Sequence, residues 1–124
     1  MDPIEELLGQ LPRGRLLTDV DVVEAYRRDE AQLVEPGRPL GVVLAHDVGD
    51  VQVTMRWATR HRIPIVARGA GTGLSGGAAA IDGCVVVSLA KMNAIVEVNV
   101  DDQLAVVEPG VINSDLQQAA GEHG

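Results

Sequence analysis

The residues of this chain that could do chemistry are concentrated in one glycine-rich stretch, residues 64–80, which reads PIVARGAGTGLSGGAAA. Five glycines fall within nine positions, from Gly69 to Gly77. Glycine tolerates positive φ and allows another group to approach the backbone closely. The side chains between the glycines are small, so the stretch presents mainly backbone N–H groups, which can form a concave anion site. This composition predicts a phosphate-binding loop.

The charge pattern indicates that backbone dipoles would have to hold such a phosphate. From Ala70 to Gly124 there is one basic residue, Lys91, against seven acidic ones. The Gly-Lys-Ser/Thr sequence of a Walker A loop does not occur. Residues 71–76 fit the pattern G-x-G-x-x-G, but the Rossmann fingerprint requires those glycines to open a helix between two strands. Only residues 77–81 separate them from the next turn and strand, so the Rossmann interpretation fails.

The elements before the glycines form a β-α-β pattern. Leu40–Ala45 is a continuous apolar run, as in a strand buried on both faces. Asp47 can cap a helix from Val48 to about His61, and Ile63–Ala67 is a second strand. The two strands are expected to be parallel, with a right-handed crossover. Helical spacing predicts an apolar stripe of Val48, Val51, Met55 and Ala58.

The elements after the glycines have a different character. Cys84–Leu89 is another buried strand. Ala94–Val100 and Leu104–Glu108 read as an antiparallel hairpin, with Asp101 and Asp102 in its turn. A helix then starts near residue 113, where Asn113 or Ser114 can cap it. The predicted fold class is α+β: a small parallel β-α-β subdomain followed by the start of an antiparallel α+β subdomain.

Residues 1–39 are predicted to be a helical lead-in to this fold, with residues 40–124 as the first part of a ligand-binding domain. Residues 3–11 read as a short helix with Pro3 at its first position. Residues 19–28 read as a second helix, with acids early and arginines late, which matches the helix dipole.

Three segments in order carry a resemblance to a known family: PIVARGAGTGLSGGA, then VVVSLAKMNAIVEV, then VVEPGV followed by a helix. They resemble the flavin-binding domain of the vanillyl-alcohol oxidase type, the PCMH-type FAD domain. The nearest branch by resemblance is the glycolate oxidase subunit and D-lactate or D-2-hydroxyacid dehydrogenase group. The resemblance runs from about Leu40 to Gly124 and continues more weakly back to Asp19.

The resemblance implies an FAD site made by two segments. The glycine-rich segment would hold the FAD pyrophosphate, and residues 109–111 would flank the cofactor's other side. The implied residues are Gly69, Ala70, Gly71, Thr72, Gly73, Leu74, Ser75, Gly77, Ala78, Pro109, Gly110 and Val111. Arg68 either contacts the cofactor or anchors the loop through hydrogen bonds to carbonyls.

Two positions depart from the family pattern. Some relatives carry in this loop a histidine that bonds covalently to the flavin, where this chain has Thr72. A threonine hydroxyl cannot make that bond, so the expectation is non-covalent FAD. Family members usually have a proline after the first strand, where this chain has Ala45 and His46.

The implied activity is FAD-dependent oxidation of a small 2-hydroxy acid such as glycolate or D-lactate, with electrons passed to an unidentified acceptor. In this family the parts that supply the general base and the substrate clamp lie beyond these residues, so no catalytic residue is assigned here. We therefore expect the chain to be the N-terminal part of a longer enzyme, inactive alone, weak in FAD binding and prone to self-association. The alternative is a non-catalytic flavin or nucleotide-binding module, or an inactive fragment.

Composition excludes some classes of partner and indicates the cellular compartment. The formal charge is −8, which argues against nucleic acid as the main partner. No apolar run is long enough to cross a membrane. The single cysteine, Cys84, fits a reducing compartment, so cytoplasmic localisation is expected, and docking on a membrane's inner face is compatible with it. Cys84 and Trp57 are predicted to be packing residues. His46 and His61 have no neighbours at metal-ligand spacing, so no metal site is assigned.

Overall fold

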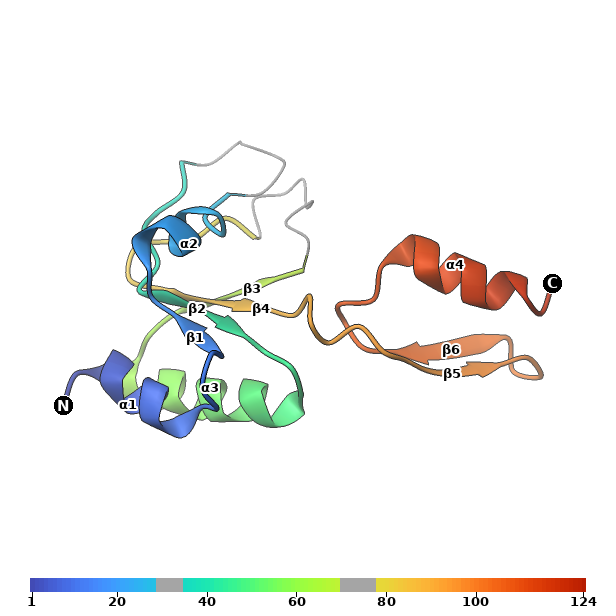
Figure 1. Ribbon diagram of the computed structural model, residues 1–124, viewed down its shortest axis with the longest axis horizontal. Coiled ribbons are helices and arrows are strands. Elements are labelled where there is room, and N and C mark those ends of the chain that lie inside the picture. Colours follow the sequence, from blue (N-terminus) through green and yellow to red (C-terminus); the bar gives the residue numbers. More distant parts are fainter. Residues whose placement is uncertain (29–34, 70–77) are drawn as a thin grey trace.

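The computed structural model describes residues 1–28, 35–69 and 78–124. Its first part is a four-stranded sheet with the strand order β1-β2-β4-β3 (Figure 1). The strands are β1 (Leu16–Leu17), β2 (Gly41–Leu44), β3 (Ile65–Arg68) and β4 (Val85–Ser88). β2 and β3 are both parallel to β4, whereas β1 is antiparallel to β2. The predicted parallel β-α-β unit is therefore confirmed, and β4 lies between its two strands.

Helices cover both faces of this sheet. α1 (Pro3–Gln10) and α3 (Val48–His61) lie on one face, and α2 (Val20–Glu24) lies on the other (Figure 1). Alternate residues of β4 divide between the two faces, because side chains alternate along a strand. Val85 and Val87 belong to the cluster on the α1 and α3 side, whereas Val86 belongs to the cluster on the α2 side, as does Cys84 just before the strand. Cys84 is buried, as predicted.

The buried face of α3 differs from the predicted stripe. Val48 and Met55 are 60% and 44% exposed, and the buried residues are Asp50, Thr54, Trp57 and Ala58. The prediction is confirmed for Ala58, which is buried, and for Val51, which packs against the core cluster. It is wrong for Val48 and Met55, because the large Trp57 side chain turns toward the core. Its indole Nε1 donates to the carbonyl oxygen of Pro3 at 2.7 Å, which ties α3 to α1.

The two polar residues on this buried face are hydrogen-bonded, as burial requires. Thr54 Oγ1 donates to the Asp50 carbonyl oxygen at 2.8 Å. The Asp50 carboxylate accepts from Arg15 Nε at 2.9 Å. Asp47 accepts from the Asp50 amide at 2.8 Å and caps α3, as predicted.

The second part of the chain is a hairpin with one helix. β5 (Ile95–Asn99) and β6 (Leu104–Val107) are antiparallel, with an irregularity between Ile95 and Glu97. α4 (Asn113–Gly121) packs along β5. The predicted hairpin and its Asp101–Asp102 turn are confirmed: Asp102 donates its amide to Asn99 Oδ1 at 3.0 Å. The predicted cap of the helix is wrong, because the N-cap is Ile112 and no side chain caps α4.

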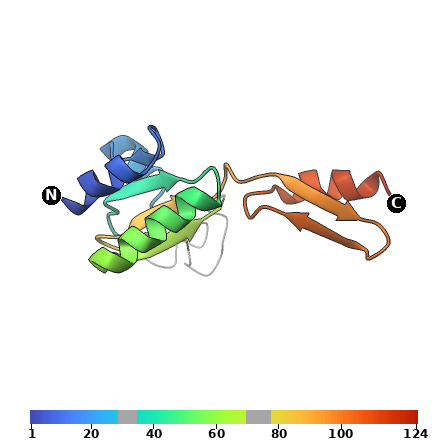
Figure 2. The ribbon, with the colours of Figure 1, turned by 90° about the horizontal axis from the view of Figure 1, so that it is seen from below.

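The hairpin and α4 form a separate block beyond the end of the sheet. Figures 1 and 2 both show this block beside the sheet, and the chain enters it through the segment that leaves β4. The predicted fold class, a parallel β-α-β subdomain followed by the start of an antiparallel α+β subdomain, is confirmed. No helix in the described ranges combines the length and apolar character needed to span a membrane.

The first 39 residues, predicted to be helical, also contain a strand of the sheet. β1 lies in this segment and extends the sheet by pairing with β2. α2 is shorter than the helix predicted over residues 19–28, because it ends at Glu24. Arg27 and Arg28 therefore lie beyond α2, and the dipole argument for them fails.

Candidate functional site

The site is defined by the edge of the sheet where three parallel strands end. Leu44, Ser88 and Arg68, the last residues of β2, β4 and β3, are register partners. In open α/β sheets, ligands bind outside the carboxyl ends of the parallel strands. Positions immediately after these strands, such as Gly69 and Leu89, are therefore the first to consider.

Leu89 brings the two predicted cofactor segments together. Its amide donates to the Arg68 carbonyl oxygen at 2.8 Å, which joins it to the end of β3. Its own carbonyl oxygen lies so close to Gly110 that a Cβ at Gly110 would approach it to 2.0 Å. The Gly110 amide also donates to the Met92 carbonyl oxygen at 2.8 Å. Pro109–Val111 therefore crosses directly over the turn that follows β4, beside the start of the glycine-rich stretch.

The structure describes only part of the predicted glycine loop. Gly69 is exposed, and a Cβ built on it would meet no atom of the described residues within 4 Å. Backbone at the end of β3 is thus open to a ligand, as a phosphate cradle requires. Ala78 is half-buried in a turn. The other predicted loop residues lie outside the described residues: Ala70, Gly71, Thr72, Gly73, Leu74, Ser75 and Gly77.

Arg68 anchors backbone on the α2 side of the sheet. Its Nη1 donates to the carbonyl oxygens of Tyr26, at 3.4 Å, and of Arg28. The guanidinium carbon lies 5.8 Å from the centroid of the Tyr26 ring, within range of a cation–π interaction. Of the two roles weighed for Arg68, these are the bonds of an anchor, made to the segment after α2.

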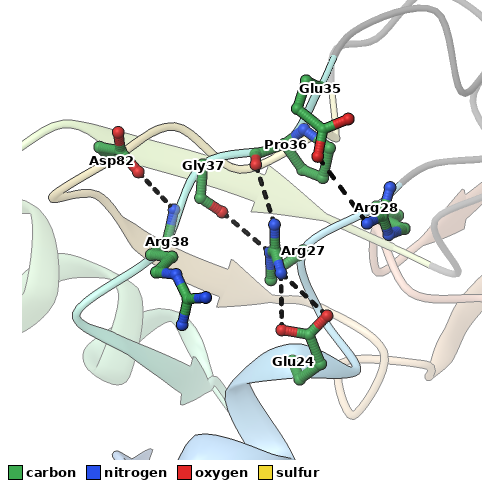
Figure 3. Close-up of polar contacts among 8 residues, drawn as sticks. All are labelled: Glu24, Arg27, Arg28, Glu35, Pro36, Gly37, Arg38 and Asp82. Atoms are coloured by element: carbon green, nitrogen blue, oxygen red, sulfur yellow. Dashed lines mark hydrogen bonds and ion pairs between the residues drawn. The ribbon is translucent and has the colours of Figure 1, made fainter.

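Arg27 has a structural role that sequence reasoning missed. Its guanidinium binds both carboxylate oxygens of Glu24 and the carbonyl oxygens of Pro36 and Gly37 (Figure 3). This hydrogen bonding holds the pKa of the Glu24 carboxyl below its usual value. No pattern in the sequence indicated these contacts, because the carbonyls lie nine and ten residues further along the chain.

The turn between β2 and α3 is held by Asp50. The His46 amide donates to Asp50 Oδ2 at 2.9 Å, and the Ala45 amide donates to the Ser88 carbonyl oxygen at 3.1 Å. The backbone at the position of the family's usual proline is thus fixed by hydrogen bonds instead. The His46 side chain is exposed at the carboxyl edge of the sheet.

Cys84 is a buried packing residue. Burial raises the pKa of the Cys84 thiol, which keeps it protonated and unreactive. Within residues 1–28, 35–69 and 78–124, no three His, Cys, Asp or Glu side chains are grouped so as to hold a metal ion.

Comparison with known proteins identifies the class to which this geometry belongs. Residues 39–124 match the family model described as the FAD binding domain. The chain therefore belongs to the FAD-binding domain family.

Two relatives illustrate the range of proteins it resembles. It is 40% identical over 121 residues to a D-2-hydroxyglutarate dehydrogenase of Stutzerimonas stutzeri, covering 98% of this chain and 26% of that protein. It is 41% identical over 105 residues to the glycolate oxidase subunit GlcD of Escherichia coli, covering 85% of this chain and 19% of that protein. The chain thus spans about a quarter or less of the length of these relatives.

Solved structures agree on the fold. The 4-ethylphenol oxidase of Gulosibacter chungangensis matches with a TM-score of 0.85 at 28% identity, over 99% of this chain and 24% of that one. p-Cresol methylhydroxylase matches with a TM-score of 0.82 at 28% identity, over 98% of this chain and 24% of that one. These matches confirm the PCMH-type fold expected from the sequence.

Proposed function

We propose that this chain is the FAD-binding part of an FAD-dependent oxidoreductase that acts on small 2-hydroxy acids such as glycolate or D-lactate. The observation that carries the proposal is the meeting of the two predicted cofactor segments at Leu89, on the carboxyl edge of the sheet. The names of the relatives, which include D-2-hydroxyglutarate dehydrogenase, D-lactate dehydrogenase and glycolate oxidase subunit, support the substrate class.

In this proposal the chain's own residues bind and orient the cofactor. Backbone N–H groups of residues 69–75, with Gly77 and Ala78, hold the pyrophosphate in place of lysines. Pro109, Gly110 and Val111 flank the cofactor from the side of the hairpin. When bound, FAD supplies the acceptor for the electron pair released as the hydroxyl-bearing carbon is oxidised to a ketone or aldehyde.

The test is reduction of the bound flavin in the intact protein. Under anaerobic conditions we expect glycolate, D-lactate or D-2-hydroxyglutarate to bleach the visible absorption of the flavin, with L-lactate as the enantiomer control. The variant Gly73→Val should purify without flavin, because a β-branched side chain would fill the space proposed for the pyrophosphate. Gly9→Val, whose added Cβ meets nothing within 4 Å, should retain it.

Three outcomes would each contradict part of this proposal. A protein that purifies without flavin, and takes up none when FAD is added, would remove the cofactor assignment. A flavoprotein that no 2-hydroxy acid reduces would leave the cofactor assignment and remove the substrate class. A Gly73→Val variant with the parent's flavin content would show that the glycine-rich stretch does not hold the pyrophosphate.

We also expect the flavin to be non-covalently bound. The reason is Thr72, which offers no ring nitrogen for attachment to the isoalloxazine. Acid or heat denaturation should therefore release all of the flavin into solution. Flavin fluorescence that stays with the protein band on a denaturing gel would show that a covalent link exists.

A further inference from the structure

The turn that follows α2, residues 26–28, contacts both ends of residues 68–80, the part of the glycine-rich stretch that carries the clustered glycines. At one end, Arg68 Nη1 donates to the carbonyl oxygens of Tyr26 and Arg28. At the other end, the Ala80 amide donates to the carbonyl oxygen of Arg27 at 2.8 Å. Three successive carbonyls therefore hold residue 68 and residue 80 close to each other.

The side chain of Arg27 fixes this turn in place. Its side chain is only 12% exposed. Nη1 donates to the two carboxylate oxygens of Glu24 at 2.9 and 2.7 Å, Nη2 donates to the Pro36 carbonyl oxygen at 3.0 Å, and Nε donates to the Gly37 carbonyl oxygen at 3.1 Å. Figure 3 shows these bonds converging on one guanidinium. We call residues 24–28 and 36–38 the Arg27 platform.

The platform also forms hydrogen bonds with Ala80 and with Asp82, two residues further on. The Gly37 amide donates to the Ala80 carbonyl oxygen at 2.8 Å, and the Arg38 amide donates to Asp82 Oδ1 at 2.7 Å. A Cβ at Gly37 would lie 2.2 Å from the Asp82 amide nitrogen, so the two backbones touch. The exit of the glycine-rich stretch is thus held on two sides by the platform.

The bonding of Arg27 leaves little capacity for a ligand. A guanidinium has five N–H donors, and its four bonds here all go to protein oxygens. A lysine could not replace it, because its single ammonium lacks the planar fork that reaches two carbonyls and a carboxylate together. Any effect of Arg27 on a cofactor must therefore act through the backbone that it holds.

We propose that Arg27 and Arg68 are positioning residues for the cofactor, which hold the two ends of the glycine-rich stretch at a fixed separation through the Arg27 platform. This inference rests on the proposed function, in which that stretch binds the FAD pyrophosphate. Glycine loses more backbone entropy than any other residue when its conformation is fixed, and five glycines fall within nine positions here. Fixing both ends beforehand reduces the part of that loss which binding must offset.

The experiment measures ligand affinity in the intact protein after removal of its flavin. The ligands are FAD and ADP, since ADP carries two linked phosphates without the isoalloxazine ring. The variants are Arg27→Met, Arg68→Met and the double variant. Arg60→Met is the matched control. Arg60 lies on α3, on the other face of the sheet, and forms an ion pair with Glu6 of α1 at 2.6 Å. Hydrogen exchange of the Ala80 amide reports directly on the platform, and that of Val85, in the buried strand β4, reports on the core.

We expect each single variant to raise the Kd of both FAD and ADP by about tenfold, the loss of one charge-assisted hydrogen bond. The double variant should raise the Kd by less than the product of the two single increases, because both residues act through one platform. Ala80 should exchange faster while Val85 does not change, and Arg60→Met should match the parent. Should the methionine variants fail to fold, Arg27→Lys and Arg68→Lys should show a smaller effect of the same kind.

Three results would overturn this inference alone. Unchanged affinities in both single variants would remove any positioning role. An effect of Arg68→Met without an effect of Arg27→Met would mean that Arg68 acts on the cofactor directly. Equal acceleration of exchange at Ala80 and Val85 would indicate a general loss of stability. A parent protein that binds neither FAD nor ADP would overturn the proposed function, and this inference with it.

Discussion

Replacing Gly110 by alanine is expected to displace the hairpin block from the sheet. The added Cβ would lie 2.0 Å from the Leu89 carbonyl oxygen and 2.8 Å from that of Met92. Both neighbours are backbone atoms, so no side chain can turn aside to relieve the overlap. The free energy of unfolding should fall by about 2–3 kcal/mol, in the upper part of the range for overpacking. The same variant should lose bound flavin, because Gly110 belongs to both the chain crossing and the proposed site.

Urea denaturation and flavin absorbance of the purified protein check this prediction. Gly121→Ala is the matched control in the same block, since an added Cβ there meets nothing within 4 Å at the end of α4. It should leave flavin content unchanged and alter stability by less than about 1 kcal/mol. If Gly110→Ala kept the parent's unfolding curve and flavin content, the close crossing at Leu89 could not be what joins the two segments.

Replacing Trp57 by alanine is expected to have a larger effect on stability. The Trp57 side chain is completely buried between α3, α1 and the sheet, and its Nε1 binds the Pro3 carbonyl oxygen. Removing it leaves a large cavity and breaks the hydrogen bond to Pro3, at a cost of about 3–5 kcal/mol. Since whole domains are stable by about 5–15 kcal/mol, this loss is a large part of the free energy of unfolding. Urea denaturation followed by circular dichroism measures it.

Two further variants divide this effect into its parts. Trp57→Phe keeps most of the buried bulk and removes the hydrogen bond to Pro3, so we expect a smaller loss, of about 1–2 kcal/mol. Met55→Ala removes an apolar side chain that is 44% exposed on the same helix, and should change stability by no more than about 0.5 kcal/mol. A larger loss for Met55→Ala than for Trp57→Ala would mean that α3 buries the face predicted from its spacing and not the face seen in the structure.

The contrast between Trp57 and Met55 shows which features of α3 the sequence predicts and which it does not. Helical spacing predicted the helix over residues 48–61 correctly, and Asp47 was correctly identified as its cap. The spacing could not decide which face is buried, because apolar and small side chains occur on more than one side of α3. That choice depends on Trp57 finding the Pro3 carbonyl 54 residues earlier in the chain.

Strand order shows the same division between local and distant information. Continuous apolar runs identified β2 and β4 as buried strands, and alternation identified the hairpin of β5 and β6. Nothing within those segments indicates that β4 lies between β2 and β3, or that β1 extends the sheet. Strand pairing is settled by contacts between residues far apart in the chain, which a local pattern does not contain.

The sequence by itself determined which residues are predicted to make the candidate site. Clustered glycines, small side chains and the single basic residue between positions 70 and 124 predict a backbone-based phosphate site before any fold is known. Only the tertiary structure decided what surrounds that site: Gly110 against Leu89, Arg68 on the carbonyls of residues 26 and 28, and Arg27 beneath them. The physical reason is that these contacts depend on backbone carbonyls, which every residue type carries, so no choice of side chain reveals which ones will meet.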